Sequence, residues 1–180
     1  GQQKRRRKMQ QWIIIASADQ NWGIGFQNKL LARVPEDMKQ VAAKTRGKTI
    51  VMGRKTLESF PQGKPLPDRT NVVLTENKSF TVENALVVHS IPELLEQLKD
   101  YQDEIYVFGG ESIYRQLLPL CSKAYITRFH AAFQADAFLP DFDTLADWEL
   151  VEKEPVQVSK TGIKYQFLEY RSNRSGHSIS

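Results

Sequence analysis

One carboxylate in this chain has a setting that suits proton chemistry. Asp37 lies early in a half-apolar segment, with Val34 before it and Met38 and Val41 after it. One interpretation is an acid stabilised by the positive end of its own helix. The other is a buried carboxylate whose two oxygens accept an N–H/NH2 pair side by side, such as the 2-amino-4-oxo edge of a pterin. Burial among apolar groups would raise the pKa of Asp37 and couple it to proton delivery.

Two glycine-containing blocks suit the binding of phosphates, because each stands where a predicted strand leads into a predicted helix. The run Gly53-Arg54-Lys55-Thr56 would place backbone N–H groups and the positive end of a helix dipole beside a ligand. Its two basic side chains would also suit the additional 2′-phosphate of NADPH. The pair Gly109-Gly110 would let the backbone approach a ligand closely, although two glycines equally make a tight turn.

Three other features read as ordinary structure when each is taken alone. Gly23-Ile24-Gly25 is compatible with a plain turn, and Arg69, which follows a Pro-rich stretch, with a surface charge. Thr127 is compatible with a β-branched residue in a strand. A functional interpretation of these residues depends on a resemblance to a known family.

Strand-like and helix-like segments alternate along the chain and must position these residues. Expected strands cover residues 12–16, 48–52, 71–74, 86–88, 104–108 and 124–129, and expected helices cover 36–44, 54–60, 92–99 and 112–118. Two further strands, 148–151 and 163–170, follow without a helix between them. The pattern predicts a single-domain α/β fold with a mostly parallel central sheet of about eight strands, flanked by helices, and an antiparallel C-terminal edge. Ligands of such sheets bind outside the carboxyl ends of the strands.

Length and composition indicate one globular domain. A chain of 180 residues, 41% hydrophobic and 26% charged, is ordinary for a soluble protein with a sizeable core. The longest apolar run, residues 12–16, is too short to cross a bilayer, and no segment has the layout of a signal peptide. The single cysteine, Cys121, excludes an internal disulfide and fits a reducing compartment.

The net charge of +4 belongs to a basic run at residues 4–8, without which the chain is close to neutral. We therefore expect a disordered basic tail at 1–10, a folded domain at 11–171 and a flexible tail at 172–180.

In their order and spacing, the blocks resemble dihydrofolate reductase over roughly residues 12–170. The resemblance implies reduction of 7,8-dihydrofolate to 5,6,7,8-tetrahydrofolate, for one-carbon metabolism, by a hydride from NADPH and a proton at N5. Asp37 would hold the pterin and favour the protonated substrate, and Thr127 would hydrogen-bond at the same end of the site. The family also carries a cis peptide between the glycines that match Gly109 and Gly110. Gly23-Ile24-Gly25 would be a mobile loop that closes over the nicotinamide.

The resemblance assigns the site residues one by one. Asp37 and Thr127 would be catalytic, and Arg69 would grip the α-carboxylate of the folate's glutamate. The substrate would contact Ile15, Ala16, Asp37, Met38, Val41, Phe60, Leu66, Arg69, Phe108 and Thr127. NADPH would contact Ser17, Ile24, Gly25, Gly53, Arg54, Lys55, Thr56, Leu74, Thr75, His89, Gly109, Gly110, Glu111, Ser112, Ile113 and Tyr114. Asp136 fits the acidic loop that often pairs with the mobile loop, and no metal is implied.

The chain departs from the family pattern in three places. Leu31 and Ala32 stand where many members have Pro and a Trp that helps to hold an active-site water, so proton delivery is expected to differ. Val41 stands where an aromatic ring often packs on the substrate tail, which is expected to weaken folate binding. Glu76 lies where a small or basic residue often meets the 2′-phosphate, and an acid there repels a phosphate.

Two other functions stay open on the sequence. A related pteridine or riboflavin-pathway reductase would keep the cofactor blocks but would need neither Asp37 nor Arg69. A nucleic-acid-binding module led by residues 4–8 would hold phosphates without reading sequence, but the rest of the chain has no basic stripe. We expect a cytoplasmic monomer whose partners are dihydrofolate, NADPH and antifolate inhibitors, and not metals, membranes or nucleic acids.

Overall fold

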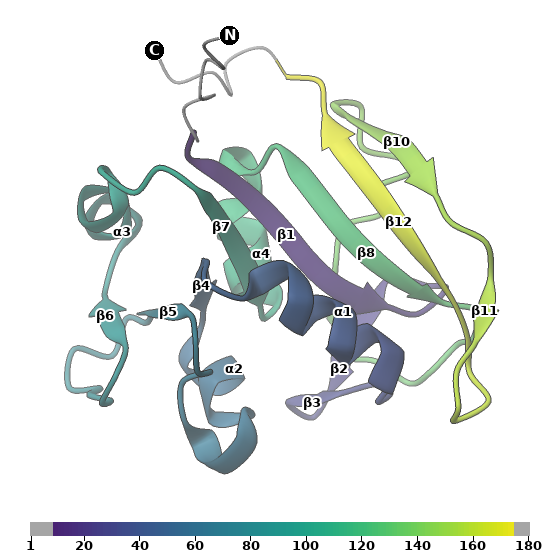
Figure 1. Ribbon diagram of the computed structural model, residues 1–180, viewed down its shortest axis with the longest axis horizontal. Coiled ribbons are helices and arrows are strands. Elements are labelled where there is room, and N and C mark those ends of the chain that lie inside the picture. Colours follow the sequence, from purple (N-terminus) through teal and green to yellow (C-terminus); the bar gives the residue numbers. More distant parts are fainter. Residues whose placement is uncertain (1–8, 175–180) are drawn as a thin grey trace, which may run out of the picture.

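The computed structural model describes residues 9–174, which form a central sheet with helices packed on both faces (Figure 1). Residues 1–8 and 175–180, in which most of the two expected tails lie, are outside this range. The helices are α1 (Pro35–Thr45), α2 (Arg54–Glu58), α3 (Ile91–Leu98) and α4 (Glu111–Leu117), with 3-10 turns at Pro61–Gly63 and Leu118–Leu120. The strands are β1 (Gln11–Ala18), β2 (Gly23–Phe26), β3 (Lys29–Leu30), β4 (Thr49–Met52), β5 (Thr70–Leu74), β6 (Leu86–Val88), β7 (Glu104–Gly109), β8 (Lys123–Phe129), β9 (Ala137–Phe138), β10 (Trp148–Lys153), β11 (Gln157–Val158) and β12 (Lys164–Ser172).

The main sheet has the mixed topology that the sequence predicts. Its strand order is β10-β12-β8-β1-β7-β4-β5-β6, and β11 pairs with β12 beside this path. Every neighbouring pair from β8 to β6 is parallel. At the other edge, β12 runs antiparallel to both β8 and β10. The α/β fold with an antiparallel C-terminal edge is therefore confirmed.

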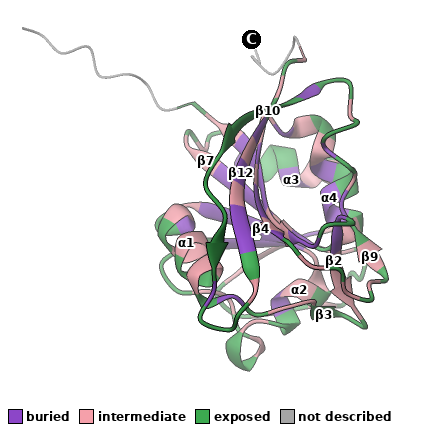
Figure 2. Ribbon diagram, turned by 90° about the vertical axis from the view of Figure 1, so that its right-hand side faces the viewer, coloured by how far each residue is buried: buried purple, intermediate pink, exposed green. Residues whose placement is uncertain are grey.

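Alternate residues of the central strands face two layers of core, one on each side of the sheet. Ile13 packs with Leu57 of α2. Its neighbour Ile14 points the other way and packs with the cluster that contains Leu94 of α3 and Leu117 of α4. Figure 2 shows α1 on one side of the sheet and α3 and α4 on the other. Strands buried on both faces read as continuous apolar runs, which is why the sequence identifies them.

The segment Gly23-Ile24-Gly25, expected to be a loop, is a strand. It belongs to β2, which lies between β3 and β9 in a second, antiparallel sheet of three short strands. Gly23 pairs with Phe138 and Gly25 with Ala137. The loop prediction was wrong because two glycines weaken any strand signal, and because the partner strand β9 lies far along the chain.

Gln10 and Ser172, which the sequence assigns to the two tails, also belong to the folded part. The Gln10 side-chain amide donates to the carbonyls of Leu98 (2.6 Å) and Tyr101 (3.0 Å). Ser172 is the last residue of β12 and pairs with Trp148 of β10. Both residues were assigned to the tails because the sequence around them is polar. The structure shows that each is hydrogen-bonded or paired with backbone far away in the chain.

Candidate active site

Asp37 is the third residue of α1, and the start of this helix is held against the turn between β11 and β12. Pro35 occupies the first helical turn, where its fixed φ and missing N–H are tolerated. The Glu36 carboxylate then accepts hydrogen bonds from Ser159 Oγ (2.8 Å) and from the Lys160 backbone N–H (3.1 Å). This anchorage fixes the direction in which the next side chain, Asp37, leaves the helix.

The Asp37 carboxylate meets Thr127 of β8, as the family resemblance implies. Thr127 donates its hydroxyl to Asp37 Oδ1 at 2.5 Å. Ile15 in the second half of β1 and Val41 of α1 line the same pocket. Burial raises the pKa of Asp37, and the hydrogen bond from Thr127 opposes that rise because it stabilises the charged form. The result is an acid that keeps its proton to higher pH than an ordinary aspartate does.

Tyr114 of α4 connects the paired glycines to Ile15 of β1. Its phenol donates to the Ile15 carbonyl at 2.9 Å. Its ring covers Gly109, where an added Cβ atom would lie 2.4 Å from the ring carbon Cε2. Burial, and secondly the negative charge of Asp37, raise the pKa of the Tyr114 phenol. Tyr114 is therefore a fixed, protonated donor close to the acid.

The two predicted phosphate blocks adjoin each other. The Gly53 N–H donates to the Gly109 carbonyl at 2.9 Å, and the Gly109–Gly110 peptide is cis, as the resemblance implies. Gly53 and Gly110 are the N-caps of α2 and α4, and as glycines they offer no capping side chain. A Cβ atom at Gly53 would lie 3.2 Å from Ile113, whereas one at Gly110 would meet no atom within 4 Å. Two helix starts without a capping side chain thus lie next to each other, and the one at Gly110 faces open space.

The side chains of these blocks are engaged to different degrees. Arg54 pairs with Glu58 at 2.5 Å on the surface of α2, and Lys55 is exposed. Thr56 is half-buried on the same helix. Ser112 of α4 accepts a hydrogen bond from the side chain of Gln116 at 2.9 Å.

The ends of β5 and β6 bring together the other residues expected to contact NADPH. The Thr75 N–H donates to the Val88 carbonyl at 3.0 Å, and His89 Nδ1 lies 2.9 Å from the Thr75 carbonyl. A carbonyl only accepts, so His89 carries its hydrogen on Nδ1 in this contact. Leu74 is buried below these residues, and Glu76 is exposed beside them.

Arg69 lies against the last turn of α1 and is held by neutral acceptors. Its guanidinium donates to Thr45 Oγ1 (2.8 Å), to the Ala42 carbonyl (2.9 Å) and to the Pro67 carbonyl (2.6 Å). Burial, and then the nearby charge of Arg46, lower the pKa of Arg69. None of its hydrogen-bond partners is charged, and the opposite charge of Asp68 acts on it less than burial and Arg46 do. Such a site suits a carboxylate ligand.

Apolar side chains between Arg69 and Asp37 form one cluster on the α1 face of the sheet. Phe60 and Phe108 meet edge to face, with ring centroids 6.1 Å apart. Val41 and Leu66 pack in the same cluster. Met38, by contrast, is 51% exposed and does not belong to this cluster.

Sequence reasoning missed Asp19, a fully buried acid that organises the turn before β2. Its Oδ1 accepts the N–H groups of Asn21 (2.9 Å) and Gly23 (2.8 Å), and its Oδ2 accepts the N–H of Phe133 (2.9 Å). The turn 19–23 is thereby tied to the loop between β8 and β9. The sequence feature that could have indicated this role is the position of an acidic residue directly after a buried strand.

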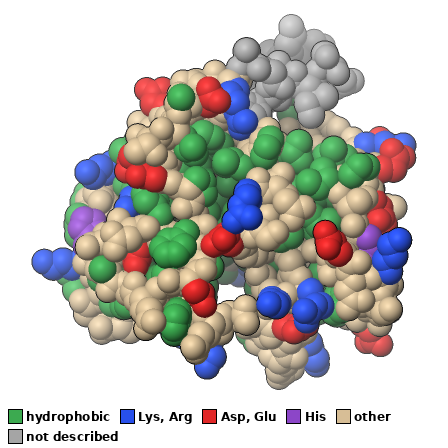
Figure 3. Space-filling view, turned by 180° about the vertical axis from the view of Figure 1, so that it is seen from behind, with side chains coloured by type: hydrophobic (Ala, Val, Ile, Leu, Met, Phe, Trp, Pro, Cys, Tyr) green, Lys and Arg blue, Asp and Glu red, His purple; other side chains and the backbone are tan. Residues whose placement is uncertain are grey.

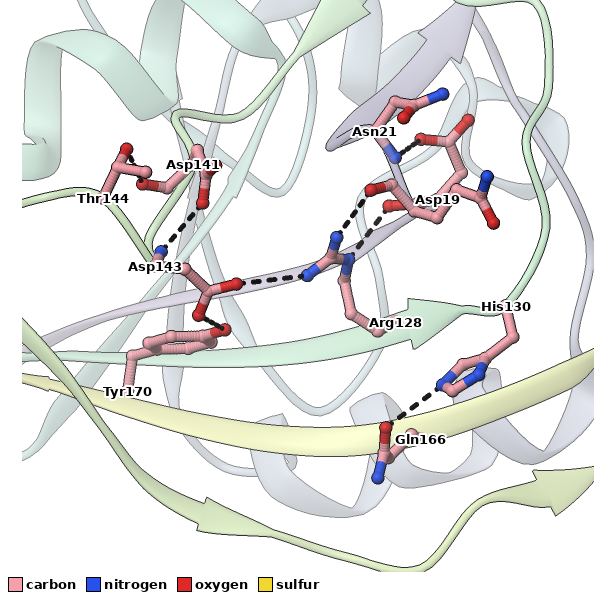
Figure 4. Close-up of polar contacts among 10 residues, drawn as sticks. Asp19, Asn21, Arg128, His130, Asp141, Asp143, Thr144, Gln166 and Tyr170 are labelled. Atoms are coloured by element: carbon pink, nitrogen blue, oxygen red, sulfur yellow. Dashed lines mark hydrogen bonds and ion pairs between the residues drawn. The ribbon is translucent and has the colours of Figure 1, made fainter.

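Arg128 of β8 completes this junction (Figure 4). It donates to the backbone carbonyls of Asp19 (2.9 Å) and Gln20 (2.8 Å) and lies 3.9 Å above the Trp22 ring. Its other side faces Asp143, whose carboxylate accepts the Tyr170 phenol at 2.8 Å. The base of β2 is therefore fixed by charge-assisted hydrogen bonds and by an aromatic contact.

The β2 segment also meets the acidic loop. The Asp136 N–H donates to the Gly25 carbonyl (2.9 Å), and Asp136 Oδ2 accepts the Gln27 N–H (3.0 Å). Ile24 of β2 and Ala16 of β1 both pack against the main core, and Ser17 follows Ala16 at the end of β1.

Two kinds of feature are missing from residues 9–174. No group of three or more His, Cys, Asp or Glu side chains in this range is placed to hold a metal ion. Its helices are also all too short or too polar to span a membrane.

Comparison with known proteins places this geometry in context. The family model for dihydrofolate reductase matches residues 11–172. A dihydrofolate reductase of Staphylococcus aureus is 38% identical over 156 residues, which cover 86% of this chain and 94% of that protein. One from Staphylococcus haemolyticus is 36% identical over 164 residues, 89% of this chain and 95% of that protein. The solved structure of dihydrofolate reductase from Enterococcus faecalis, complexed with NADP(H) and RAB-propyl, superimposes with a TM-score of 0.83 at 33% identity and covers 91% of this chain and 97% of that one.

Proposed function

The chain belongs to the dihydrofolate reductase family, and we propose that the pocket around Asp37 is where it reduces 7,8-dihydrofolate to 5,6,7,8-tetrahydrofolate with NADPH. The contact that carries this proposal is the hydrogen bond from Thr127 to a half-buried Asp37 whose pKa is raised by burial. Asp37 is the one acidic residue among those lining that pocket in the described part of the chain. An acid so placed matches the amino edge of a pterin.

The residues around Asp37 divide the work of binding and proton handling. Asp37 accepts the N–H/NH2 pair of the pterin, and its charge favours the substrate protonated at N5. Thr127 donates to one carboxylate oxygen, which keeps a second lone pair, so both oxygens can still accept from the ligand. Tyr114 orients the Ile15 carbonyl of β1, where the pterin and the nicotinamide would meet.

The cofactor blocks fit NADPH, which when bound supplies the hydride for C6. The open space at Gly110 and the uncapped starts of α2 and α4 suit its pyrophosphate. Arg54 and Lys55 would favour the 2′-phosphate, whereas the exposed Glu76 would oppose it. The β2 segment would cover the nicotinamide and keep water from the path of the hydride.

The reaction is tested by following the loss of NADPH absorbance with dihydrofolate as substrate, and by repeating the assay with NADH. We expect clearly faster turnover with NADPH than with NADH. Equal efficiency with NADH would mean that Glu76 cancels Arg54 and Lys55. No turnover with either cofactor, in a folded protein, would contradict the proposed function.

Replacing Arg69 with leucine should raise the KM for dihydrofolate by about 10- to 100-fold, because a hydrogen-bonded charge pair contributes about 1.5–3 kcal/mol. NADPH binding should not change, since the Arg69 partners Thr45, Ala42 and Pro67 are not among the residues expected to contact the cofactor. Arg46→Leu is the matched control, because Arg46 is a neighbouring but exposed cation. Steady-state kinetics with each substrate varied would check this, and an equal loss of affinity for both ligands would contradict it.

The remaining functional expectations concern partners and location. Planar compounds that offer an N–H/NH2 pair to Asp37 should compete with dihydrofolate, which makes antifolates the expected inhibitors. We propose a cytoplasmic monomer. A nucleic-acid-binding role is less well supported: residues 4–8 lie outside the described range, and basic and acidic side chains are interspersed on the face in Figure 3.

A further inference from the structure

An acid, Glu111, stands at the start of α4, directly after the paired glycines. An uncompensated carboxylate here would repel the pyrophosphate that the proposed function places beside Gly110. In the structure the Glu111 carboxylate contacts two other groups. Its Oε1 pairs with Arg115 Nη2 at 2.8 Å, and its Oε2 accepts the backbone N–H of Phe138 at 2.5 Å.

The second of these contacts connects two parts of the site. Phe138 belongs to β9, which pairs with β2 through Gly23 and Gly25. Gly23 pairs with Phe138 itself, so one face of Phe138 meets the β2 segment and its N–H meets α4. The Glu111 carboxylate is thus a direct link between the glycine turn of the cofactor site and the strand pair that would cover the nicotinamide.

The two contacts of Glu111 differ in strength. The Arg115 side chain is 71% exposed, and exposed ion pairs contribute little because water and salt screen them. The hydrogen bond to Phe138 also lies at the surface, but it joins the carboxylate to a backbone donor held in a strand, and charge-assisted bonds of this kind are the stronger class. The link to β9 is therefore the contact that constrains structure, and the exposed ion pair with Arg115 adds little to it.

We infer that Glu111 is a positioning residue that couples cofactor binding at the start of α4 to the placement of β2 and β9 over the nicotinamide. This inference rests on the proposed function. A cofactor bound at Gly110 and covered by β2 would leave only when the strand pair lifts, and the Glu111–Phe138 bond opposes that movement. Loss of the bond should speed the release of the cofactor without affecting the dihydrofolate pocket.

The test measures NADPH dissociation directly, by mixing the enzyme–NADPH complex with excess NADP⁺ and following cofactor fluorescence. Glu111→Ala should release NADPH about tenfold faster, as expected for one charge-assisted hydrogen bond. Glu111→Gln keeps a carbonyl acceptor for Phe138 and should stay within about threefold of the wild type. Arg115→Ala, the matched control, removes only the exposed ion pair and should behave like the wild type.

A second measurement separates coupling from a general loss of structure. Hydrogen exchange should show that NADP⁺ protects the β2 backbone in the wild type and in Glu111→Gln, but much less in Glu111→Ala, with the KM for dihydrofolate unchanged. Equal dissociation rates for Glu111→Ala and Arg115→Ala would overturn the inference, as would an equal loss of affinity for both substrates. A wild-type protein that binds no NADPH would overturn the proposed function as well, so the two failures are distinguishable.

Discussion

Asp37→Asn should lower turnover at neutral pH by about 10²- to 10³-fold, the usual range for losing a group that handles a proton, while making the fold more stable. The reason for both effects is burial. In the proposed function the carboxylate would hold the pterin and favour the protonated substrate, but ionising it inside the pocket costs free energy, and this cost raises the pKa of Asp37. An amide of the same shape can still accept the Thr127 hydroxyl without that cost.

The sign of the stability effect depends on pH. Because the pKa of Asp37 is higher in the folded state than in the unfolded chain, the wild type is favoured below the ordinary value of 3.8 and loses that stability as the pH rises through the raised value. Asp37→Asn does not titrate there. Its melting temperature should exceed that of the wild type at neutral pH, and the difference should shrink towards pH 3.8 and below.

Thermal unfolding and initial rates over a range of pH would check this prediction. The loss of turnover should be smaller at low pH, where the substrate arrives already protonated. Glu96→Gln is the control, since it neutralises an exposed acid of α3 that pairs with Lys99 outside the pocket. Unchanged turnover of Asp37→Asn at neutral pH would contradict the role of Asp37, and a lower melting temperature would contradict the account of its burial.

The parts of the fold that the sequence predicted are those specified by local pattern. Parallel strands covered on both faces, such as β1 and β7, are recognisable as apolar runs, and the amphipathic stretch of α3 as a helix. The short strands β2, β3 and β9 have no such pattern. They exist because their backbone groups find partners in segments far away in the chain, and a single-sequence pattern does not contain that information.

The same distinction applies to the site. Asp37 and the two glycine blocks stood out because their residue types are unusual for their local setting. Asp19 and Arg128 did not, since their roles consist of hydrogen bonds to backbone groups of loops whose path the sequence does not give. Glu111 was expected along the pyrophosphate, but its contacts with Arg115 and Phe138 depend on where β9 lies.

Gly109→Ala should destabilise the fold by about 2–5 kcal/mol, combining the usual costs of overpacking and of a side chain at positive φ. Gly109 has a φ of 94°, and its Cβ atom would lie 2.4 Å from the Tyr114 ring. That ring has little freedom to move, because its phenol is bonded to the Ile15 carbonyl and the side chain is buried. Chemical denaturation of the wild type and the variant would measure the difference.

Gly110→Ala is the matched control for this prediction, and the comparison separates packing from ligand binding. Gly110 has a φ of −75°, and an added Cβ atom meets no protein atom within 4 Å, so stability should change by about 1 kcal/mol at most. The same open space is where the cofactor pyrophosphate would approach, so Gly110→Ala should still weaken NADPH binding.

If both variants were as stable as the wild type, the Tyr114 ring would not be held over Gly109. If Gly110→Ala bound NADPH normally, the pyrophosphate would lie elsewhere. If both predictions hold, the adjacent glycines serve different purposes: the packing of the fold requires Gly109, and the binding of the ligand requires Gly110.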